Sequence, residues 1–310
     1  MDRVAGAFKR GFWIYAARKD TLLRKSLFIL GNCNALTYKL AFKALLPDWD
    51  VSEFALVEQN RDQRADVGEK VGNAEIVLFQ DELTNLPELA NLEECLVGRT
   101  VVRVPFLTTY RYHPDLNQAW LNGRMVPNGR FSMHSSTVFL GYKRGRSVDE
   151  VLKVLSDPSV QVFGEIGMND AFEQRCIASF SNVGINLKKL MPLWSRFEAF
   201  THVPHHPVSQ ALTDIAQEIA LINGWIKSTQ RIQPDFLDPL RGTQLPVYAS
   251  VARTFGISPR PFARDSQMRE YTLKEWIEVG YETYQEWDRL GWTDDVQFAR
   301  DVEPLLDSVV

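Results

Sequence analysis

The sequence has few cysteines and no long apolar run. Of its 310 residues only three are cysteine, an odd number that argues against a disulfide scaffold, so we expect a cytoplasmic protein. No stretch approaches the roughly 18 consecutive apolar residues of a membrane span. Lysine and arginine number 35 against 39 aspartate and glutamate, and the basic residues are dispersed. The sequence therefore predicts neither a membrane span nor binding to nucleic acid.

Common nucleotide and metal motifs are also missing. The chain has no Walker A lysine motif and no Gly-x-Gly-x-x-Gly segment, so nucleotide binding of those types has no support. His202, His205 and His206 cluster ahead of Asp214, but this spacing matches no common zinc pattern and the cysteines lie far away. We therefore expect no metal site.

The N-terminal segment, residues 1–25, is basic, with seven Lys/Arg and two Asp. Phe8, Phe12 and Tyr15 lie close to helical spacing, which predicts an amphipathic helix. Its aromatic face either packs on the protein, which we favour, or rests on an anionic membrane surface at the inner face of the cytoplasmic membrane. Lysine and arginine interrupt the apolar segment, so we expect no signal peptide.

The first half has the spacing of strands that alternate with helices. Short β-favouring runs recur at intervals of roughly 25 residues, which predicts βαβ units and a parallel sheet. These runs are Leu27–Leu30, Glu53–Val57, Glu75–Phe79 and Thr100–Phe106.

The helix that follows the first run is predicted from its apolar spacing. Pro47 ends it, because proline cannot continue a helix. Its expected buried face consists of Leu36, Leu40, Ala41, Ala44 and Leu45.

The second half reads as mainly helical. We predict helices over Ser147–Leu155, Pro207–Ser228 and Thr272–Leu290, separated by long loops at Gln233–Pro246 and Ser258–Ser266. The expected domains are therefore an α/β domain at residues 1–145 and a mainly helical domain at residues 146–310.

Local signals support two of these helices. The middle helix has Pro207 in its first turn. Its expected apolar stripe is Val208, Leu212, Ile215, Ile219 and Ile222. The last helix opens with Thr272 and Glu275 at the spacing of a capping box.

A Gly-Asn-Cys turn lies between the first strand and the first helix. Gly31 allows a tight turn, and the amides of Asn32, Cys33 and Asn34 would face whatever lies above the strand end. Cys33 would lie at the positive end of the helix dipole, which predicts a lowered thiol pKa and a candidate nucleophile. The alternative is a small buried cysteine with a structural role.

Two of the five histidines precede proline, at His113-Pro114 and at His206-Pro207. A histidine beside a helix N-terminus stays neutral near pH 7 and can accept a proton. Asp115 could orient either imidazole or cap a turn. The alternative for each histidine is a loop residue with satisfied hydrogen bonds. Six basic residues near the presumed strand ends or the interdomain join could hold phosphates: Arg99, Arg103, Arg111, Lys143, Arg144 and Arg146.

With these segments in place, the sequence resembles the WcbI-type family of capsular polysaccharide biosynthesis proteins. The resemblance rests on Leu27–Asn34, Val77–Gln80, Tyr112–Asp115 and Phe200–Pro207, in an order and spacing that hold over about residues 27–255. The sequence departs from the family in having asparagine after the cysteine instead of glutamine, and histidine before the second His-Pro instead of asparagine.

This resemblance implies a fold and an activity. The fold is an α/β domain of the SGNH-hydrolase type, a parallel sheet in three layers, followed by a mainly helical portion, with coenzyme A near the join. The activity is acetyl transfer from acetyl-CoA to a sugar hydroxyl of a capsule precursor. We further expect peripheral association with the capsule assembly machinery at the inner membrane. The alternatives are an SGNH-like esterase or deacetylase and a non-catalytic capsule-assembly component.

Acetyl transfer needs a base that deprotonates the acceptor hydroxyl. We assign His206 to this role, with His113 as the rival and Asp115 as the orienting partner. Cys33 would either take the acetyl group covalently or line the thioester pocket during direct transfer.

The reaction also needs donors for the oxyanion of the tetrahedral intermediate. The amides near Gly31 and Cys33, with the Asn32 or Asn34 side chain, would supply them. Gln80 at the third strand end and Arg111 are further cofactor-binding candidates.

Overall fold

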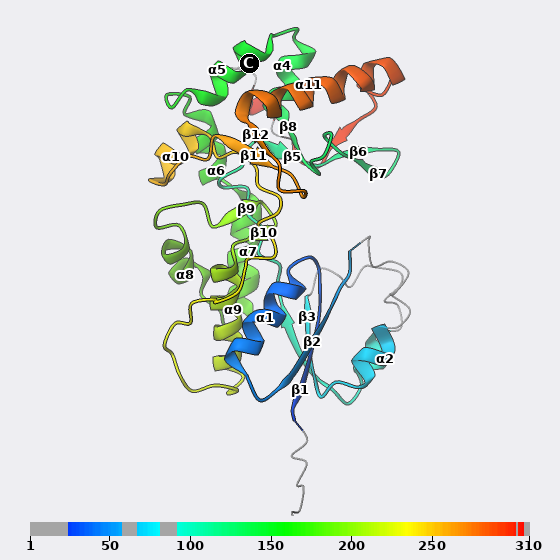
Figure 1. Cartoon of the computed structure of the whole chain (residues 1–310), viewed down its shortest axis with the longest axis vertical. Coiled ribbons are helices and arrows are strands. Elements are labelled where there is room, and N and C mark those ends of the chain that lie inside the picture. The colour runs from blue at the N-terminus through cyan, green and yellow to red at the C-terminus, as the bar shows by residue number, and fades with distance from the viewer. Residues whose placement is uncertain (1–23, 58–66, 81–91, 302, 307–310) are drawn as a thin grey trace, which may run out of the picture.

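The computed structural model describes residues 24–57, 67–80, 92–301 and 303–306 (Figure 1). The expected amphipathic helix lies almost wholly outside these residues. Within them, no helix is both long enough and apolar enough to cross a bilayer.

Four parallel strands form the N-terminal sheet, as the sequence predicts. They lie in the order β2-β1-β3-β4. Their bounds are β1 Ser26–Gly31, β2 Asp50–Ala55, β3 Ile76–Gln80 and β4 Thr100–Val104. The chain runs from β1 to β2 on one side and then crosses to β3 on the other. The carboxyl ends of β1 and β3 therefore flank a topological switch point, where open α/β sheets bind ligands.

Helices cover both faces of this sheet, which gives three layers (Figure 1). Leu27 and Ile29 of β1 belong to the core that contains α1 (Ala35–Leu45). Phe28 and Leu30 point the other way, into a second core with α2 (Val67–Gly72), beside which α3 (Leu92–Leu96) packs. Side chains alternate across a strand, so β1 is buried on both faces.

The buried face of α1 differs from the expected one. Leu36 is 40% exposed and Ala44 is exposed as well. The helix packs between β2 and α9 (Ser209–Ile222), so two neighbours rather than one set its buried side. That side consists of Ala35, Thr37, Tyr38, Ala41, Phe42 and Leu45.

Most of the remaining helices follow residue 145. They are α5 Val148–Ser156, α6 Val162–Met168, α7 Ala171–Asn182, α8 Leu187–Trp194, α9, α10 Ala249–Phe255, α11 Leu273–Leu290 and the short α12 Glu303–Leu306. The helices predicted over Ser147–Leu155 and Thr272–Leu290 are confirmed as α5 and α11. The capping box of α11 is present between Thr272 and Glu275, and α5 has an equivalent one.

The middle helix is shorter than predicted. It begins at Ser209, and Pro207 lies in the short strand β10 (His206–Pro207), so its expected place in the first helical turn was wrong. The buried stripe includes Leu212, Ile215 and Ile219, but Ile222 is 52% exposed.

Short antiparallel strands connect the helices. They are β5 Leu116–Asn117, β6 Ala119–Leu121, β7 Arg124–Val126, β8 His134–Ser135, β9 Thr201–Val203, β10, β11 Phe262–Arg264, β12 Glu270–Thr272 and β13 Gln297–Phe298. The presence of β11 corrects the expected loop at Ser258–Ser266, because this segment pairs with β12.

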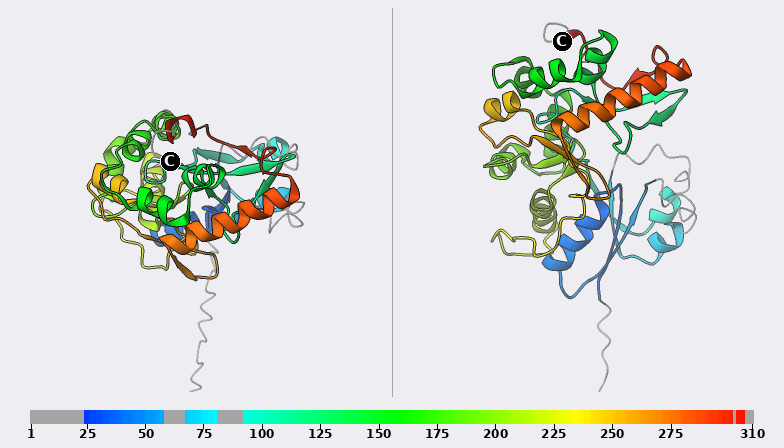
Figure 2. Two further views of the ribbon diagram at one scale, coloured as in Figure 1. Left: turned by 90° about the horizontal axis from the view of Figure 1, so that it is seen from above. Right: turned by 45° about the horizontal axis from the view of Figure 1, so that its top comes forward.

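The molecule is elongated, with the parallel sheet at one end. At the other end α11 packs against α5 and against α4 (Ser136–Lys143), as both views in Figure 2 show. Between the two ends lie α7, α8 and the β9–β10 hairpin (Figure 1). The carboxyl ends of the parallel strands point towards this middle region.

Candidate functional site

The ends of β1 and β3 are joined by a hydrogen bond across the switch point. The Asn32 amide donates to Gln80 Oε1 at 2.6 Å, and the Asn34 amide donates to Asn32 Oδ1 at 2.9 Å. A Cβ atom on Gly31 would overlap Gln80 Oε1. Only glycine therefore allows this approach, and the structure brings together Gly31, Asn32, Cys33, Asn34 and Gln80.

Two buried amide groups at these strand ends lack partners. Asn34 Nδ2 and Gln80 Nε2 are both buried, and neither has a hydrogen-bond partner among the described residues. Both atoms are donors, and a buried donor without an acceptor is unfavourable. The turn can therefore accept an oxygen atom of a ligand.

The Cys33 thiol does not have the lowered pKa that the helix dipole predicts. Burial raises its pKa to about 11, and the backbone amides of Cys33 and Asn34 offset only part of that rise. The expectation of an activated thiol was therefore wrong. Desolvation outweighs the dipole, and the thiol stays protonated at neutral pH in the ligand-free protein.

A cavity of about 520 Å³ opens beside this turn. It lies at the carboxyl ends of the parallel strands, the usual ligand position in such sheets. The residues lining it include Asn32, Thr108, Tyr110, Arg175, Cys176 and His205. They come from the turn after β1, the loop after β4, helix α7 and the β9–β10 hairpin.

The loop after β4 is held against the start of α7. The Thr109 hydroxyl lies 3.0 Å from Asp170 Oδ2 and 2.9 Å from Glu173 Oε2. The Tyr110 amide donates to Asp170 Oδ2 at 2.6 Å, and Asp170 also caps α7. One carboxylate thus fixes both the loop and the helix that form the cavity wall.

The β9–β10 hairpin carries two neutral histidines, and of these His205 lines the cavity. The His206 ring contacts the His205 ring edge-on, with 4.5 Å between the ring centroids. Burial lowers the pKa of His205 to about 4 and that of His206 to about 3. His206 Nδ1 is buried and has no partner among the described residues. Both imidazoles are therefore neutral at neutral pH, and their low pKa values make them weak bases.

His113 and Asp115 are engaged elsewhere in the fold. His113 Nδ1 donates to the Pro246 carbonyl at 3.0 Å, and burial lowers the pKa of this ring to about 3. Asp115 Oδ2 accepts hydrogen bonds from the Ser135 hydroxyl and, at 3.1 Å, from Tyr248. Ser135 caps α4, so Asp115 holds the side chain of this capping residue in place.

Arg111 points to a different cavity. It pairs with Glu173 and lines a separate cavity of about 440 Å³. All six basic residues singled out for phosphate binding lie in the described part of the chain, and none of them lines the cavity beside Asn32. Arg175 lines it instead, with its guanidinium 4.3 Å from the Phe172 ring centroid. Arg175 could not be predicted from the sequence, because an exposed arginine on a helix carries no local signal of function.

The histidine cluster is not arranged around a metal position. Within the residues that the structure describes, no three His, Cys, Asp or Glu side chains are placed to hold a metal ion.

Comparison with known proteins adds one structural match. No protein-family model matches the sequence, and no curated protein matches it. A solved structure of WcbI matches with a TM-score of 0.63 over 87% of this chain and 97% of that chain. This chain has the fold of WcbI. The sequence identity is 15%, so the likeness that the sequence predicted is shown at the level of the fold.

WcbI is described as a polysaccharide biosynthesis enzyme. The matching structure is its native protein without a disulfide bond between coenzyme A and a cysteine.

Proposed function

We propose that this protein is an acetyltransferase that uses acetyl-CoA to O-acetylate a sugar hydroxyl in polysaccharide biosynthesis. The observation that carries the proposal is the cavity at the β1–β3 switch point, which adjoins buried amide donors without partners. The shared fold with WcbI supports coenzyme A as the ligand class. An SGNH-like ancestry, a cytoplasmic location and peripheral contact with the capsule assembly machinery belong to the same proposal.

The residues at the cavity suit the reactive end of acetyl-CoA. Asn34 Nδ2 and Gln80 Nε2 are donors in need of an acceptor, and Arg175 supplies a positive charge on the wall. When bound, acetyl-CoA supplies an acyl carbonyl that is already activated towards attack.

The amide donors would stabilise negative charge on the carbonyl oxygen. The backbone amides of Asn32 and Asn34 already donate to Gln80 Oε1 and Asn32 Oδ1, so the side-chain donors Asn34 Nδ2 and Gln80 Nε2 would take this role. One well-placed donor of this kind contributes about 3–4 kcal/mol to transition-state stabilisation. Replacing Asn34 by Ala should therefore lower turnover more than it lowers substrate affinity.

We assign the general base to His206, with His113 as the rival. His205 lines the cavity and contacts the His206 ring, so it is a third candidate. His206→Ala should cut turnover by about 100-fold or more if this residue takes the proton. Wild-type turnover in that variant would move the assignment to His205, which the matched His205→Asn variant tests.

The protonated state of Cys33 favours direct transfer over an acetyl-cysteine intermediate. In direct transfer the thiol only lines the thioester pocket. Cys33→Ala should then keep turnover within about threefold of wild type, because no bond to sulfur is made or broken. Loss of turnover in a Cys33→Ala protein that still binds coenzyme A would establish the covalent route instead.

The activity itself is tested by measuring free thiol released from acetyl-CoA when a panel of sugars is added. The proposal predicts release that depends on both the sugar and the enzyme. Hydrolysis of a simple acetyl ester without coenzyme A, together with no sugar-dependent release, would contradict it and would indicate an esterase.

A further inference from the structure

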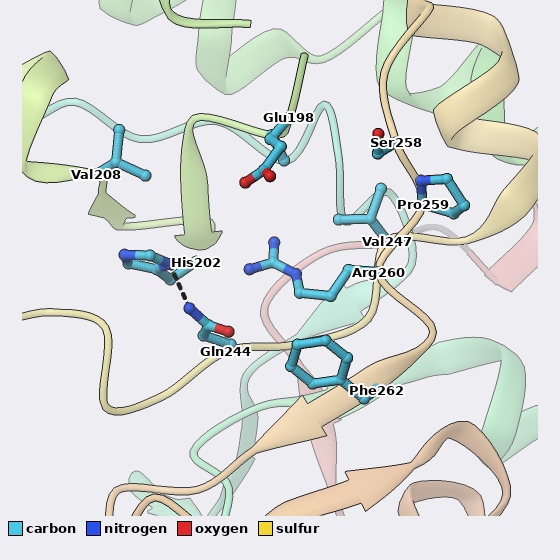
Figure 3. Close-up of a pocket in the computed structure, with 10 residues that line it drawn as sticks. Glu198, His202, Val208, Gln244, Val247, Ser258, Pro259, Arg260 and Phe262 are labelled. Atoms are coloured by element: carbon cyan, nitrogen blue, oxygen red, sulfur yellow. Dashed lines mark hydrogen bonds between the residues drawn. The ribbon is translucent and has the colours of Figure 1, made fainter.

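A third cavity, of about 210 Å³, lies apart from the candidate site. We call it the Arg260 pocket; Glu198, His202, Gln244, Val247 and Arg260 line it (Figure 3). His202 belongs to the same hairpin that carries His205 to the larger cavity, but it lines only this one. Nothing in the proposed transfer reaction uses the pocket.

Arg260 is a half-buried cation that faces the carboxylate of Glu198 across the pocket. Its guanidinium extends into the pocket (Figure 3), where one Nη donates to the Thr201 carbonyl at 2.9 Å. Its Nε is buried and has no hydrogen-bond partner among the described residues, and the charge of Glu198 offsets part of the effect of burial on its pKa. Burial lowers its pKa to about 10, so it remains charged at neutral pH. The buried Nε–H lacks an acceptor, which is unfavourable unless an oxygen atom of a ligand supplies one.

The backbone holds Arg260 in place. Its amide and carbonyl exchange hydrogen bonds with those of Val247 at 3.0 and 2.9 Å. The guanidinium therefore points into the pocket from a fixed position, as binding of a defined ligand requires.

A chain of hydrogen bonds orients the polar wall that faces Arg260. Asp238 Oδ2 lies 2.9 Å from His202 Nε2 and accepts from the Ser209 amide at 3.0 Å. The proton on Nε2 leaves Nδ1 as an acceptor for Gln244 Nε2 at 3.1 Å. The Gln244 amide is thereby fixed beside Arg260, where a ligand can meet both side chains (Figure 3).

The rim of the pocket has a different chemistry. Glu198 is exposed and stands opposite the Arg260 guanidinium (Figure 3). Its carboxylate can accept hydrogen bonds from the hydroxyl groups of a ligand, but it repels a second negative charge. The volume is below the roughly 300 Å³ of a site for a drug-sized molecule. The pocket therefore suits a small ligand with one anionic end and neutral hydroxyls.

We propose that the Arg260 pocket binds an anionic sugar, with its carboxylate or phosphate against Arg260 and its hydroxyls against Glu198 and Gln244. The proposal concerns binding alone, so it stands or falls independently of acetyl transfer.

The test is a calorimetric titration of the full chain with glucuronate, with glucose 1-phosphate and with neutral glucose. We expect saturable binding of at least one charged sugar and much weaker binding of glucose. Glucuronate binding alone identifies a carboxylate ligand, and glucose 1-phosphate binding alone identifies a phosphate ligand. Equal binding of glucose, or no saturation by either charged sugar, would overturn the proposal.

Variants locate the binding. Arg260→Gln should weaken binding of the charged sugar by about 10-fold or more, because the substitution removes a charge-assisted hydrogen bond. Arg253→Gln is the matched control: Arg253 is exposed on α10 and does not line the pocket, so its affinity should equal that of wild type. Wild-type affinity in a folded Arg260→Gln protein would place the ligand elsewhere and overturn the proposal.

A second variant covers the case in which Arg260→Gln does not fold. Glu198→Gln keeps a hydrogen-bond acceptor and removes the rim charge, so it should tighten binding by about two- to fivefold. Unchanged affinity in this variant would contradict the proposal. Loss of sugar binding in wild-type protein saturated with coenzyme A would assign the anion contact to coenzyme A phosphates, which also overturns it.

Discussion

At the residue scale, the turn after β1 shows how much a short motif can predict. Gly31, Asn32 and Gln80 meet because parallel strands end at the same edge of the sheet, and this could be expected from their strand positions. The raised pKa of Cys33 could not be predicted, because it depends on how much protein packs over the thiol. Arg175 and Arg260 carry no local signal, since distant segments bring them to their cavities. His205 stands out in the sequence only as the neighbour of the second His-Pro motif, which does not show that it lines the cavity.

Gly31→Ala should damage the site and the fold together. The added Cβ would overlap Gln80 Oε1, and relieving such an overlap typically costs about 1–3 kcal/mol of unfolding free energy. Urea denaturation checks this value. Gly72→Ala is the control, because a Cβ there meets nothing within 4 Å. Since Gln80→Ala removes the overlapping atom, the double variant Gly31→Ala/Gln80→Ala should regain part of the loss, and no regain would contradict this account of the turn.

Asp115→Asn separates a structural role from a catalytic one. Its carboxylate is fully buried and accepts from Ser135 and Tyr248 at the start of α4. The substitution should lower the unfolding free energy by about 1–3 kcal/mol, because it weakens buried hydrogen bonds. Turnover measured well below the melting temperature should stay near wild type. A large fall in turnover with unchanged stability would restore Asp115 as the partner of a catalytic histidine.

At the element scale, the sequence predicts the regular elements better than their environment. The parallel strands, α5 and α11 follow from strand runs and capping boxes, which are local. The buried face of α1 and the first residue of α9 differ from the predictions because of tertiary contacts. Helix α1 packs against two neighbours, and the pairing of β10 with β9 draws Pro207 out of the helix.

The first turn of α7 links the cavity wall to the loop after β4. Asp170→Ala should lower the unfolding free energy by about 1 kcal/mol through the lost cap. It should also weaken coenzyme A binding, because Asp170 holds the Tyr110 amide. Ser147→Ala removes the comparable cap of α5, where no cavity residue depends on it, so binding should be unchanged. Equal effects of the two substitutions on binding would rule out a role for Asp170 in shaping the cavity.

At the scale of the whole molecule, buried neutral histidines make stability depend on pH. Burial lowers the pKa of His113 and His206 to about 3 and that of His134 and His205 to about 4, against an ordinary value of 6.5. Below pH 6.5 the unfolded chain binds more protons than the folded one. Stability is therefore complete above pH 6.5 and falls as the pH drops towards the folded values.

This predicts a loss of up to about 2 kcal/mol for each such histidine between pH 7 and pH 5. Urea midpoints at the two pH values measure it. His134 lies away from the cavities and bonds the Val126 carbonyl at 2.9 Å. His134→Gln keeps a hydrogen-bond donor for the Val126 carbonyl. It should make the loss of unfolding free energy between pH 7 and pH 5 smaller by the contribution of one histidine. The same loss in wild type and variant would show that His134 does not contribute.

The proposal as a whole depends on coenzyme A binding at the carboxyl ends of β1 and β3. Calorimetric titration of the full chain with coenzyme A tests this most directly, with Gly31→Ala beside wild type and Gly72→Ala as the control. The account predicts micromolar affinity, about −8 kcal/mol, for wild type and the control, and weaker binding for Gly31→Ala. No binding at millimolar coenzyme A, or equal binding by all three proteins, would contradict it.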